Sequence, residues 1–461
     1  MNFGCVIAEF IRQSNNTKHE ESYLVSCLDQ GSIPCISTMK KMKKMKKILF
    51  ILLILSQFIA ISQICGYDHV IAKKMSENSF MNNYETLYDV AIHRLSNTNQ
   101  TYYIPVVFHI VHNTESQNLP DSVIYSQIDV LNEDYRRMNE NASNTREAFL
   151  EFAGDPNIEF FLANVDPEGN PTNGIIHQYT DKEEFLMFED ILSNEITLDE
   201  VKFTSSGGSD AWNTNKYLNI WVCNIGSLDI FGLELGQVFG YAYPPVNIDE
   251  ALIELSNDQT VPDWPTDMLT NDPSVQGVVL HYTAVGRNNP SANDDGMTEN
   301  NAGRAAVHEI GHYLGLRHIW GDALALFGED GCAIDDGISD TPNANDQAGY
   351  VCDFNKNTCS GDLFGSTLED LPDMVENYMD YSPDNCLNMF TNGQINVMRN
   401  VLEIARTELI NEEAFMNNEE ITVSKKNLIH TIDILGRKSS KKGLNLDIYD
   451  DGSVEKIYII K

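Results

Sequence analysis

Residues 305–322 read AAVHEIGHYLGLRHIWGD, and this stretch decides the fold and the chemistry of the chain. It contains the pattern His308-Glu309-x-x-His312-x-x-Gly315-x-x-His318. On a helix, His308 and His312 lie one turn apart on the same face, so both imidazoles can bind one ion. Gly315 can adopt a positive φ and end the helix, which would turn His318 back toward that ion. The spacing therefore predicts a helix, a sharp turn and three histidine ligands.

Three imidazole ligands leave a fourth position for water, which is the arrangement of catalytic zinc sites. Glu309 directly follows the first ligand, so its carboxylate would lie beside the ion and take a proton from the water. A surface helix that carries histidines by chance is the alternative. Five fixed positions in order, in a chain with only 11 histidines, make that alternative the weaker one. We therefore predict a catalytic zinc site with Glu309 as general base.

A second motif lies downstream of the zinc pattern. The pattern resembles that of the metzincins, zinc endopeptidases with a methionine turn beneath the metal, and Asn377-Tyr378-Met379-Asp380-Tyr381-Ser382 supplies such a turn. The stretches HEIGHYLGLRHIWGD and ENYMDYSPDNCLNMFTNGQ resemble the pappalysin family, especially its bacterial cytophagalysin branch, over roughly Tyr102 to Leu409. The resemblance implies a metzincin-like α/β fold: a mixed twisted sheet, an active-site helix and a loop-rich, disulfide-stapled C-terminal subdomain.

The methionine turn supplies two further expectations. Met379 is expected to form a hydrophobic floor beneath the imidazoles rather than to bind the metal. By resemblance, Tyr381 matches a tyrosine that approaches the metal and stabilises the oxyanion, whereas a core tyrosine is the alternative. Some pappalysins carry an acid directly before the next cysteine, which favours a basic residue after the scissile bond. Asn385 stands there and Asp384 one position earlier, so no preference for Arg or Lys is predicted.

The chain is strongly acidic, with 68 acidic against 31 basic residues and a net charge of −37. Such a chain is a poor partner for nucleic acid or an anionic membrane. Carboxylate oxygens suit calcium, and several aspartates follow the zinc motif between residues 330 and 340. The resemblance implies a structural calcium ion there, with Asp336 and Thr341 the best matches to the ligand positions. A solvated acidic loop is the alternative, because no EF-hand spacing is present.

The N-terminal region has the order of an export signal. A basic run from Met39 to Lys47 precedes an apolar run from Ile48 to Ile61, and Ala60-Ile61-Ser62 is a small-x-small cleavage site. We predict a signal peptide over 39–62 and regard 1–38 as an extension outside the protein made in the cell. Translation would then start at Met39, Met42 or Met45. A retained membrane anchor is the alternative, which the shortness of the apolar run disfavours.

Residues 63–100 are polar and weakly patterned, as expected of a removable pro-segment. Cys65 lies just after the predicted cleavage site. Since a thiolate binds zinc strongly, Cys65 could fill the open metal position and keep the enzyme latent, as in related zymogens. Asp68 could do the same with its carboxylate. A stray thiol on a loose terminus is equally compatible with the sequence.

Export would place the cysteines in an oxidising compartment. Cys332, Cys352, Cys359 and Cys386 cluster after the zinc motif, and sequence alone cannot choose among their three possible pairings. The resemblance favours Cys332–Cys359 and Cys352–Cys386, which would staple a region with little core of its own. Cys223 ends an apolar run and is expected in a buried strand.

The catalytic domain is predicted over 101–410, with strands and helices in alternation. Apolar and aromatic runs predict strands at Tyr102–Val111, Asn157–Ala163, Lys216–Ile225 and Gln276–Val285. Helical spacing predicts helices at Asp121–Arg137, capped by its Asp, at Asn392–Arg406 and, more weakly, at Asp190–Val201. This order indicates a mixed α/β sheet. His109 and His281 lie in strand patterns and are expected to be structural.

The stretch Gly240–Pro245 is short and aromatic and ends in prolines, which suits an edge strand. By resemblance, an edge strand above the cleft pairs with extended substrate, whereas a plain turn is the alternative. Residues 247–272 look like an insertion loop.

The C-terminal region separates into a polar linker, 411–428, and a small β unit, 429–461. Strands are predicted at Ile429–Ile434, Leu444–Tyr449 and Val454–Ile460. Ile434-Leu435-Gly436-Arg437 and the ending DIYDDGSVEKIYIIK resemble the C-terminal sorting domain of type IX secretion cargo in Bacteroidota. That resemblance implies export across the outer membrane by this machinery.

The sequence thus predicts a secreted or cell-surface zinc endopeptidase that hydrolyses peptide bonds in proteins, without a stable membrane span after signal cleavage. Two other classes stay open. A secreted binding or adhesion protein with a protease-like fold is opposed by the intact ligand set and Glu309. A zinc hydrolase for non-peptide substrates is opposed by the methionine turn. The natural substrate, the cleavage preference, the route of maturation and the oligomeric state do not follow from the sequence.

Overall fold

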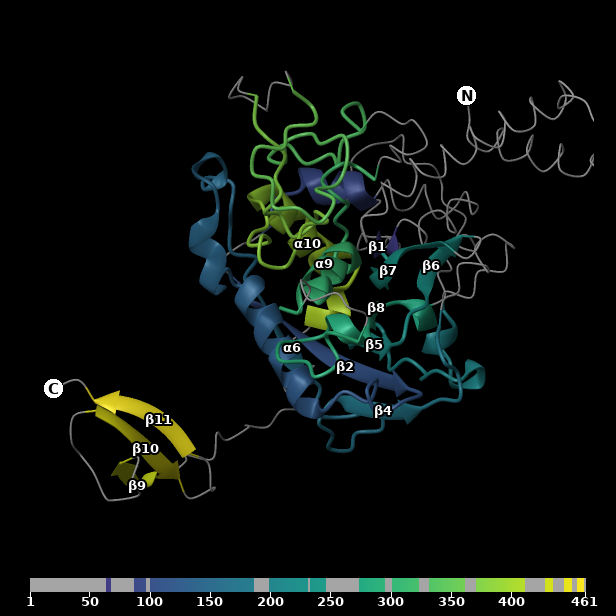
Figure 1. The fold of residues 1–461 in the computed structure, drawn as a ribbon, viewed down its shortest axis with the longest axis vertical. Coiled ribbons are helices and arrows are strands. Elements are labelled where there is room, and N and C mark those ends of the chain that lie inside the picture. The colour runs from purple at the N-terminus through teal and green to yellow at the C-terminus, as the bar shows by residue number, and fades with distance from the viewer. Residues whose placement is uncertain are drawn as a thin grey trace, which may run out of the picture. The chain divides into compact units, whose positions relative to one another are not determined.

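The computed structural model in Figure 1 divides the chain into two compact units, residues 1–410 and 411–461, which we describe separately. It describes residues 64–67, 87–96, 100–185, 199–230, 233–245, 273–294, 301–322, 331–360, 370–410, 428–433, 443–449 and 454–459. The predicted extension, signal peptide, insertion loop and linker, most of the weaker helix and Asp68 lie outside these residues.

A mixed sheet forms the frame of the larger unit. Its strands follow the order β1 (Ile64–Cys65), β7 (Leu233–Ala242), β8 (Val278–His281), β5 (Leu218–Cys223), β2 (Tyr102–His112) and β3 (Ile158–Leu162). In addition, β4 (Ile175–Tyr179) pairs with β2, and β6 (Ser227–Ile230) pairs with β7. β7 is antiparallel to β8, whereas β2, β3, β4, β5 and β8 pair in parallel. β5 is buried along its whole length, as expected of a central parallel strand covered on both faces.

Two helices pack on one face of this sheet. α6 (Asp121–Asp134) contacts β3, α9 (Arg304–Tyr313) contacts β7 and β8, and the two helices also contact each other. Alternate residues of β2, namely Ile104, Val106, Phe108 and Ile110, join the main apolar core with these helices. A separate apolar cluster on the opposite side includes Trp221, Tyr241 and Val279. α9 therefore packs against β7, and the zinc motif lies at this contact.

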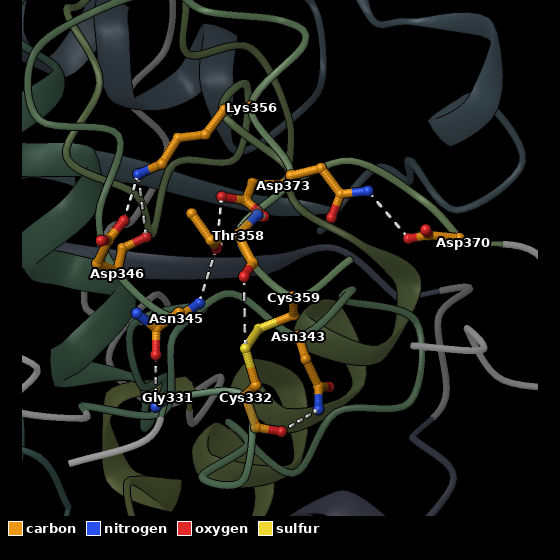
Figure 2. Close-up of a disulfide and its surroundings, with 11 residues drawn as sticks. Gly331, Cys332, Asn343, Asn345, Asp346, Lys356, Thr358, Cys359, Asp370 and Asp373 are labelled. Atoms are coloured by element: carbon orange, nitrogen blue, oxygen red, sulfur yellow. Dashed lines mark hydrogen bonds and ion pairs between the residues drawn. A yellow bond between two sulfur atoms is a disulfide. The ribbon is translucent and has the colours of Figure 1, made fainter. Parts of the chain in front are cut away.

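Two disulfides staple the loop-rich region before α10 (Asn392–Ile404). Cys332 pairs with Cys359 and Cys352 with Cys386, which confirms both predicted pairings. Figure 2 shows the first bridge among side chains that bond the backbone: Thr358 N–H donates to Asp373 Oδ1 at 3.0 Å, and Gly331 N–H donates to Asn345 Oδ1 at 3.0 Å. Because regular elements are scarce here, these bonds and the disulfides hold the loops.

Several predicted boundaries shift. α6 begins after Pro120, which adopts an extended conformation without a side-chain cap, so the predicted Asp121 cap is wrong: Asp121 already lies in the first turn. The predicted strand Gln276–Val285 is the shorter β8, followed by a 3-10 turn at Tyr282–Ala284. Gly240–Pro245 contributes only the end of the longer β7. α10 ends at Ile404, and a true capping box between Thr391 and Gln394 starts it.

The smaller unit is a three-stranded antiparallel sheet in the order β11 (Val454–Ile459), β10 (Gly443–Tyr449), β9 (Leu428–Asp433). The three strands agree with the predicted ones to within one residue at each end. Within the residues that the structure describes in both units, no helix is long and apolar enough to cross a membrane.

Candidate zinc centre

The three predicted histidines lie together at the end of α9. His308 and His312 lie one turn apart on the buried helix, which ends at Tyr313. Gly315 has φ +94°, a left-handed conformation that suits glycine, and it reverses the chain toward His318. Nε2 of His312 is 3.1 Å from Nε2 of His308 and 3.1 Å from Nε2 of His318. The three nitrogens therefore face one point.

These histidines fit a zinc ion by distance and by protonation. Two ligand nitrogens at about 2.05 Å from a tetrahedral zinc lie about 3.3 Å apart, close to the observed separations. Each Nδ1 has a hydrogen-bond acceptor: the carbonyl oxygen of Tyr378 at 2.7 Å, that of Leu316 at 2.8 Å and Asp322 Oδ1 at 2.7 Å. These bonds place the proton on Nδ1 and leave the Nε2 lone pairs for the metal. Burial also lowers the pKa of His308 to about 3 and that of His312 well below its usual value.

The methionine turn lies beneath the histidines. Met379 is fully buried, and its Sδ lies directly against Gly311 of α9. The turn is fixed from α6, because Tyr378 donates its hydroxyl hydrogen bond to Asp134 at 2.6 Å. Asp134 also pairs with Arg304 of α9 at 3.2 Å. The turn that bonds His308 is thus held by the same buried carboxylate as the start of the zinc helix.

Glu309 lies between the metal site and β7. It is only 2% exposed. A Cβ at Gly240 would lie 2.7 Å from Glu309 Cγ and 2.9 Å from its Oε1, so the carboxylate packs directly on the backbone of β7. The small cavity beside it is lined by Cys65, Ala305, His308, Ser382 and Leu387, among others.

The N-terminal strand β1 occupies this part of β7. It pairs in parallel with β7, with Cys65 opposite Gly240, and Gly66 N–H donates to the Gly240 carbonyl at 2.6 Å. The Sγ of Cys65 and the ligand nitrogens of the three histidines lie within 4.8 Å of one another. The Tyr67 ring stacks on His312 at 3.8 Å between centroids. Cys65 is thus placed as a fourth donor, rather than as a stray thiol.

Tyr381 lies beside two of the ligands. Its ring centroid is 4.9 Å from that of His318 and 5.7 Å from that of His308. Its hydroxyl accepts a hydrogen bond from the backbone N–H of Cys65 at 3.1 Å. The side chain therefore belongs to the site and not only to the core.

Asp336 and Thr341 lie in the stapled region, where Thr341 Oγ1 donates to Asp336 Oδ1 at 2.8 Å. Ile338 N–H donates to the same oxygen at 2.9 Å. Burial raises the pKa of Asp336 well above its usual value. Among the described residues, the zinc site is the only cluster of three or more His, Cys, Asp or Glu side chains close enough to share an ion.

The two strand histidines and the strand cysteine lie in the protein interior, as expected. His109 bonds Ser209 Oγ at 2.8 Å and Asn219 Oδ1 at 3.0 Å, and burial lowers its pKa to about 4. The Nδ1 of His281 accepts a hydrogen bond from Ile225 N–H at 3.0 Å, and burial lowers its pKa to about 3. Cys223 is buried in β5, and burial raises the pKa of its thiol. None of the three belongs to the zinc cluster.

Three residues of the site were not predicted from the sequence. Asp322 lies within residues 305–322, and its spacing of four residues from His318 could have indicated a contact with that ligand. No sequence pattern indicated Gly240, because its contact with Glu309 depends on the register of the strands. Asp134 appeared only as a polar position in a predicted helix.

Comparisons with known proteins agree with this geometry. A sequence profile described as pregnancy-associated plasma protein-A matches residues 283–403. Mature mirolysin of Tannerella forsythia, solved with a cleaved peptide, is 38% identical; the match covers 69% of this chain and 99% of that one, with a TM-score of 0.53. Promirolysin of the same organism is 35% identical, covering 77% of this chain and 97% of that one, with a TM-score of 0.58.

Fungal proteins match over a shorter span. An extracellular metalloprotease of Arthroderma benhamiae is 40% identical over 100 residues, which is 22% of this chain and 31% of the relative. A Colletotrichum graminicola extracellular metalloprotease is 34% identical over 134 residues, or 28% of this chain and 40% of the relative. The chain thus matches less than half the length of either of these relatives.

The fold and the histidine cluster define a zinc metalloprotease of the metzincin type. The chain belongs to the pappalysin family, whose profile bears the name pregnancy-associated plasma protein-A. The family inferred from the two sequence motifs is therefore confirmed.

Proposed function

We propose that this chain is the latent precursor of a secreted zinc endopeptidase that cleaves peptide bonds in protein substrates. One observation carries the proposal: the buried trio His308, His312 and His318 lies beside Glu309, which packs on the same part of β7 that already holds an extended peptide, β1. An extended substrate can use the same main-chain groups once β1 has left. A non-peptide substrate would have no need of this edge.

The residues divide the reaction between them. Zinc held by the three histidines would supply a Lewis acid that polarises the scissile carbonyl and lowers the pKa of water. Glu309 would take a proton from the attacking water and pass it to the leaving amine. Tyr381 would donate a hydrogen bond to the developing oxyanion. The backbone of β7 would align the substrate.

Latency follows from the same contacts. Cys65 would fill the fourth metal position, and β1 would block the strand edge. Maturation would remove residues 63–100 and expose both the fourth metal position and the edge of β7. Asp68, the other candidate for this role, lies outside the described residues, and the position of Cys65 favours the thiol.

The test compares the matured wild-type protein with Glu309→Ala in digestion of casein, while the zinc content of both is measured. We expect both proteins to bind one zinc and only the wild type to cut. A chelator should abolish cutting and added zinc should restore it. Full activity of Glu309→Ala, or no loss with chelator, would overturn the proposal. A wild type that binds zinc but cuts nothing would favour a binding protein that keeps the protease fold.

We also propose a structural calcium ion at Asp336 and Thr341. A fully buried carboxylate with a raised pKa would be compensated by a cation, and other aspartates lie nearby in the sequence. Calcium should raise the melting temperature of the wild type and leave that of Asp336→Asn unchanged. An equal response of both proteins would remove Asp336 from any calcium site.

Export would use two segments that the mature enzyme does not need. Residues 39–62 would direct the chain across the inner membrane, and the β unit at 429–461 would serve as a type IX sorting domain. The second assignment draws support from its separate three-stranded sheet. In a bacterium with that machinery, a chain that lacks 429–461 should accumulate in the periplasm. Its undiminished appearance in the medium would refute the sorting role.

A further inference from the structure

Asp322 makes two hydrogen bonds to one zinc-ligand residue. Its Oδ1 lies 2.7 Å from Nδ1 of His318 and accepts the His318 backbone N–H at 3.2 Å. The ring of His318 is fully buried, while the carboxylate is 20% exposed. The carboxylate thus fixes both the backbone and the ring of the ligand that follows the turn at Gly315.

The three ligands differ in what holds them. The Nδ1 atoms of His308 and His312 face backbone carbonyl oxygens, whereas that of His318 faces a side-chain carboxylate. Trp320 stacks on the His318 ring at 4.3 Å with an interplanar angle of 6°, which limits tilting of the ring. Stacking has no influence on the position of the ring proton. The carboxylate selects the Nδ1–H tautomer and so makes Nε2 a stronger donor to the metal.

The backbone at this residue supports a special role for the side chain. Asp322 has φ +60°, a left-handed conformation that glycine adopts at lower cost. An aspartate in this conformation has a higher conformational free energy than a glycine would have. Its carboxylate, directed at His318, accounts for that choice.

From these contacts we infer that Asp322 is a positioning residue for His318: it orients the third imidazole and strengthens its bond to the metal. The inference rests on the proposed zinc function and adds to it an asymmetry among the ligands. His318, the only one of the three histidine ligands outside the helix, depends on a side chain that no helix geometry supplies.

The backbone conformation makes a sharp test possible. Asp322→Gly suits the positive φ and removes the carboxylate, while Asp322→Asn keeps an acceptor oxygen without the charge. All proteins should carry Cys65→Ser, so that the thiolate does not mask changes in metal binding. Asp121→Asn is the matched control, because it alters another carboxylate–imidazole pair, Asp121–His177, outside the zinc site.

The readouts are the rate of zinc transfer to a chromophoric chelator, the visible spectrum of the cobalt-substituted protein and the melting temperature of the metal-free protein. We expect Asp322→Gly to weaken zinc binding about 10- to 100-fold and to change the cobalt spectrum, with a smaller effect for Asp322→Asn. The metal-free melting temperature should stay near that of the parent. Asp121→Asn should leave both metal readouts unchanged.

Unchanged zinc transfer in both Asp322 variants would overturn the inference. So would weaker zinc binding that only follows an equal loss of metal-free stability, since Asp322 would then be structural. Failure of the parent itself to bind zinc would refute the proposed function instead, so the two failures are distinguishable.

Discussion

The backbone N–H of Cys65 donates a hydrogen bond to the hydroxyl of Tyr381 at 3.1 Å. The proposed pro-segment therefore bonds the hydroxyl group proposed to stabilise the oxyanion, while its thiol faces the three histidines. Latency would then have two elements, since the fourth metal position and the oxyanion donor are occupied together.

Replacing Cys65 with Ala should make the unprocessed chain active. A thiolate would be the strongest donor holding β1 at the metal, and without it the segment retains its backbone bonds to β7 and Tyr381 and the stacking of Tyr67 on His312. Casein cleavage by intact Cys65→Ala would be measured at early times, before processing, and the double variant with Glu309→Ala, which lacks the general base, would give the background. Cys223→Ala is the matched control, because Cys223 is the other buried cysteine outside a disulfide among the described residues. A Cys65→Ala chain as inactive as the wild-type precursor would contradict thiol latency.

The proposed pro-segment, residues 63–100, has a second contact with the protein on α10. Residues 87–93 are helical, and the side chain of Asn400 donates to the Ala91 carbonyl at 2.8 Å, while that of Asn396 donates to the Arg94 carbonyl at 2.7 Å. Arg94 also pairs with Glu403 at 3.0 Å. These bonds satisfy carbonyl groups at the end of the short helix.

A cut between β1 and this helix should therefore leave the helical part bound. Replacing Asn396 and Asn400 with Ala should speed its loss after processing, because carbonyls at the helix end lose their partners. Co-purification of the cut segment, measured by mass spectrometry, tests this. Asn392→Ala, at the first position of the same helix, is the control. Equal retention by all three proteins would show that the apolar contacts of Leu87 and Ala91 suffice.

The zinc ligands could be predicted because their geometry is local. One helical turn relates His308 to His312, and a turn at one glycine brings His318 back to them. The spacing of these residues in the sequence was therefore enough to predict the site. The pairing of Cys65 with Gly240 could not be predicted in this way, because β1 has only two residues and 173 positions separate Ile64 from its partner Val238. A strand that short has no alternating pattern to detect.

Other differences have similar physical reasons. α6 stops at Asp134 rather than Arg137, since the chain reaches φ 46° at Arg137 and leaves the helical region. The role of Asp134 depends on Arg304 and Tyr378, which come from separate parts of the chain. Sequence patterns report which face of an element is apolar, but a buried polar network forms only after packing.

Gly240→Ala should lower kcat much more than it raises KM. The added Cβ would lie 2.7 Å from Glu309 Cγ, so the carboxylate must move, and displacement of a catalytic group by about 1 Å costs about 100-fold in rate. Steady-state kinetics on a peptide substrate and the zinc content of the protein would be measured together. Val238→Ala, two residues earlier on β7, is the control for general loosening of the strand. A variant with full kcat, or one that has lost its zinc, would contradict this account of Gly240.

The buried His109 should make the catalytic domain less stable in mild acid. Burial lowers the pKa of His109 in the folded protein from 6.5 to about 4. As the pH falls below 6.5, this histidine therefore becomes protonated in the unfolded chain but stays neutral in the native protein. Stability from this group is complete above pH 6.5 and falls by on the order of 3 kcal/mol as the pH approaches 4. His109→Gln keeps a polar side chain that does not titrate, so its unfolding free energy should decline less steeply over this range. Urea unfolding of the metal-free proteins at several pH values measures both slopes, with chelator present so that zinc release does not contribute. Parallel slopes for wild type and variant would show that other groups, His281 among them, account for the acid sensitivity.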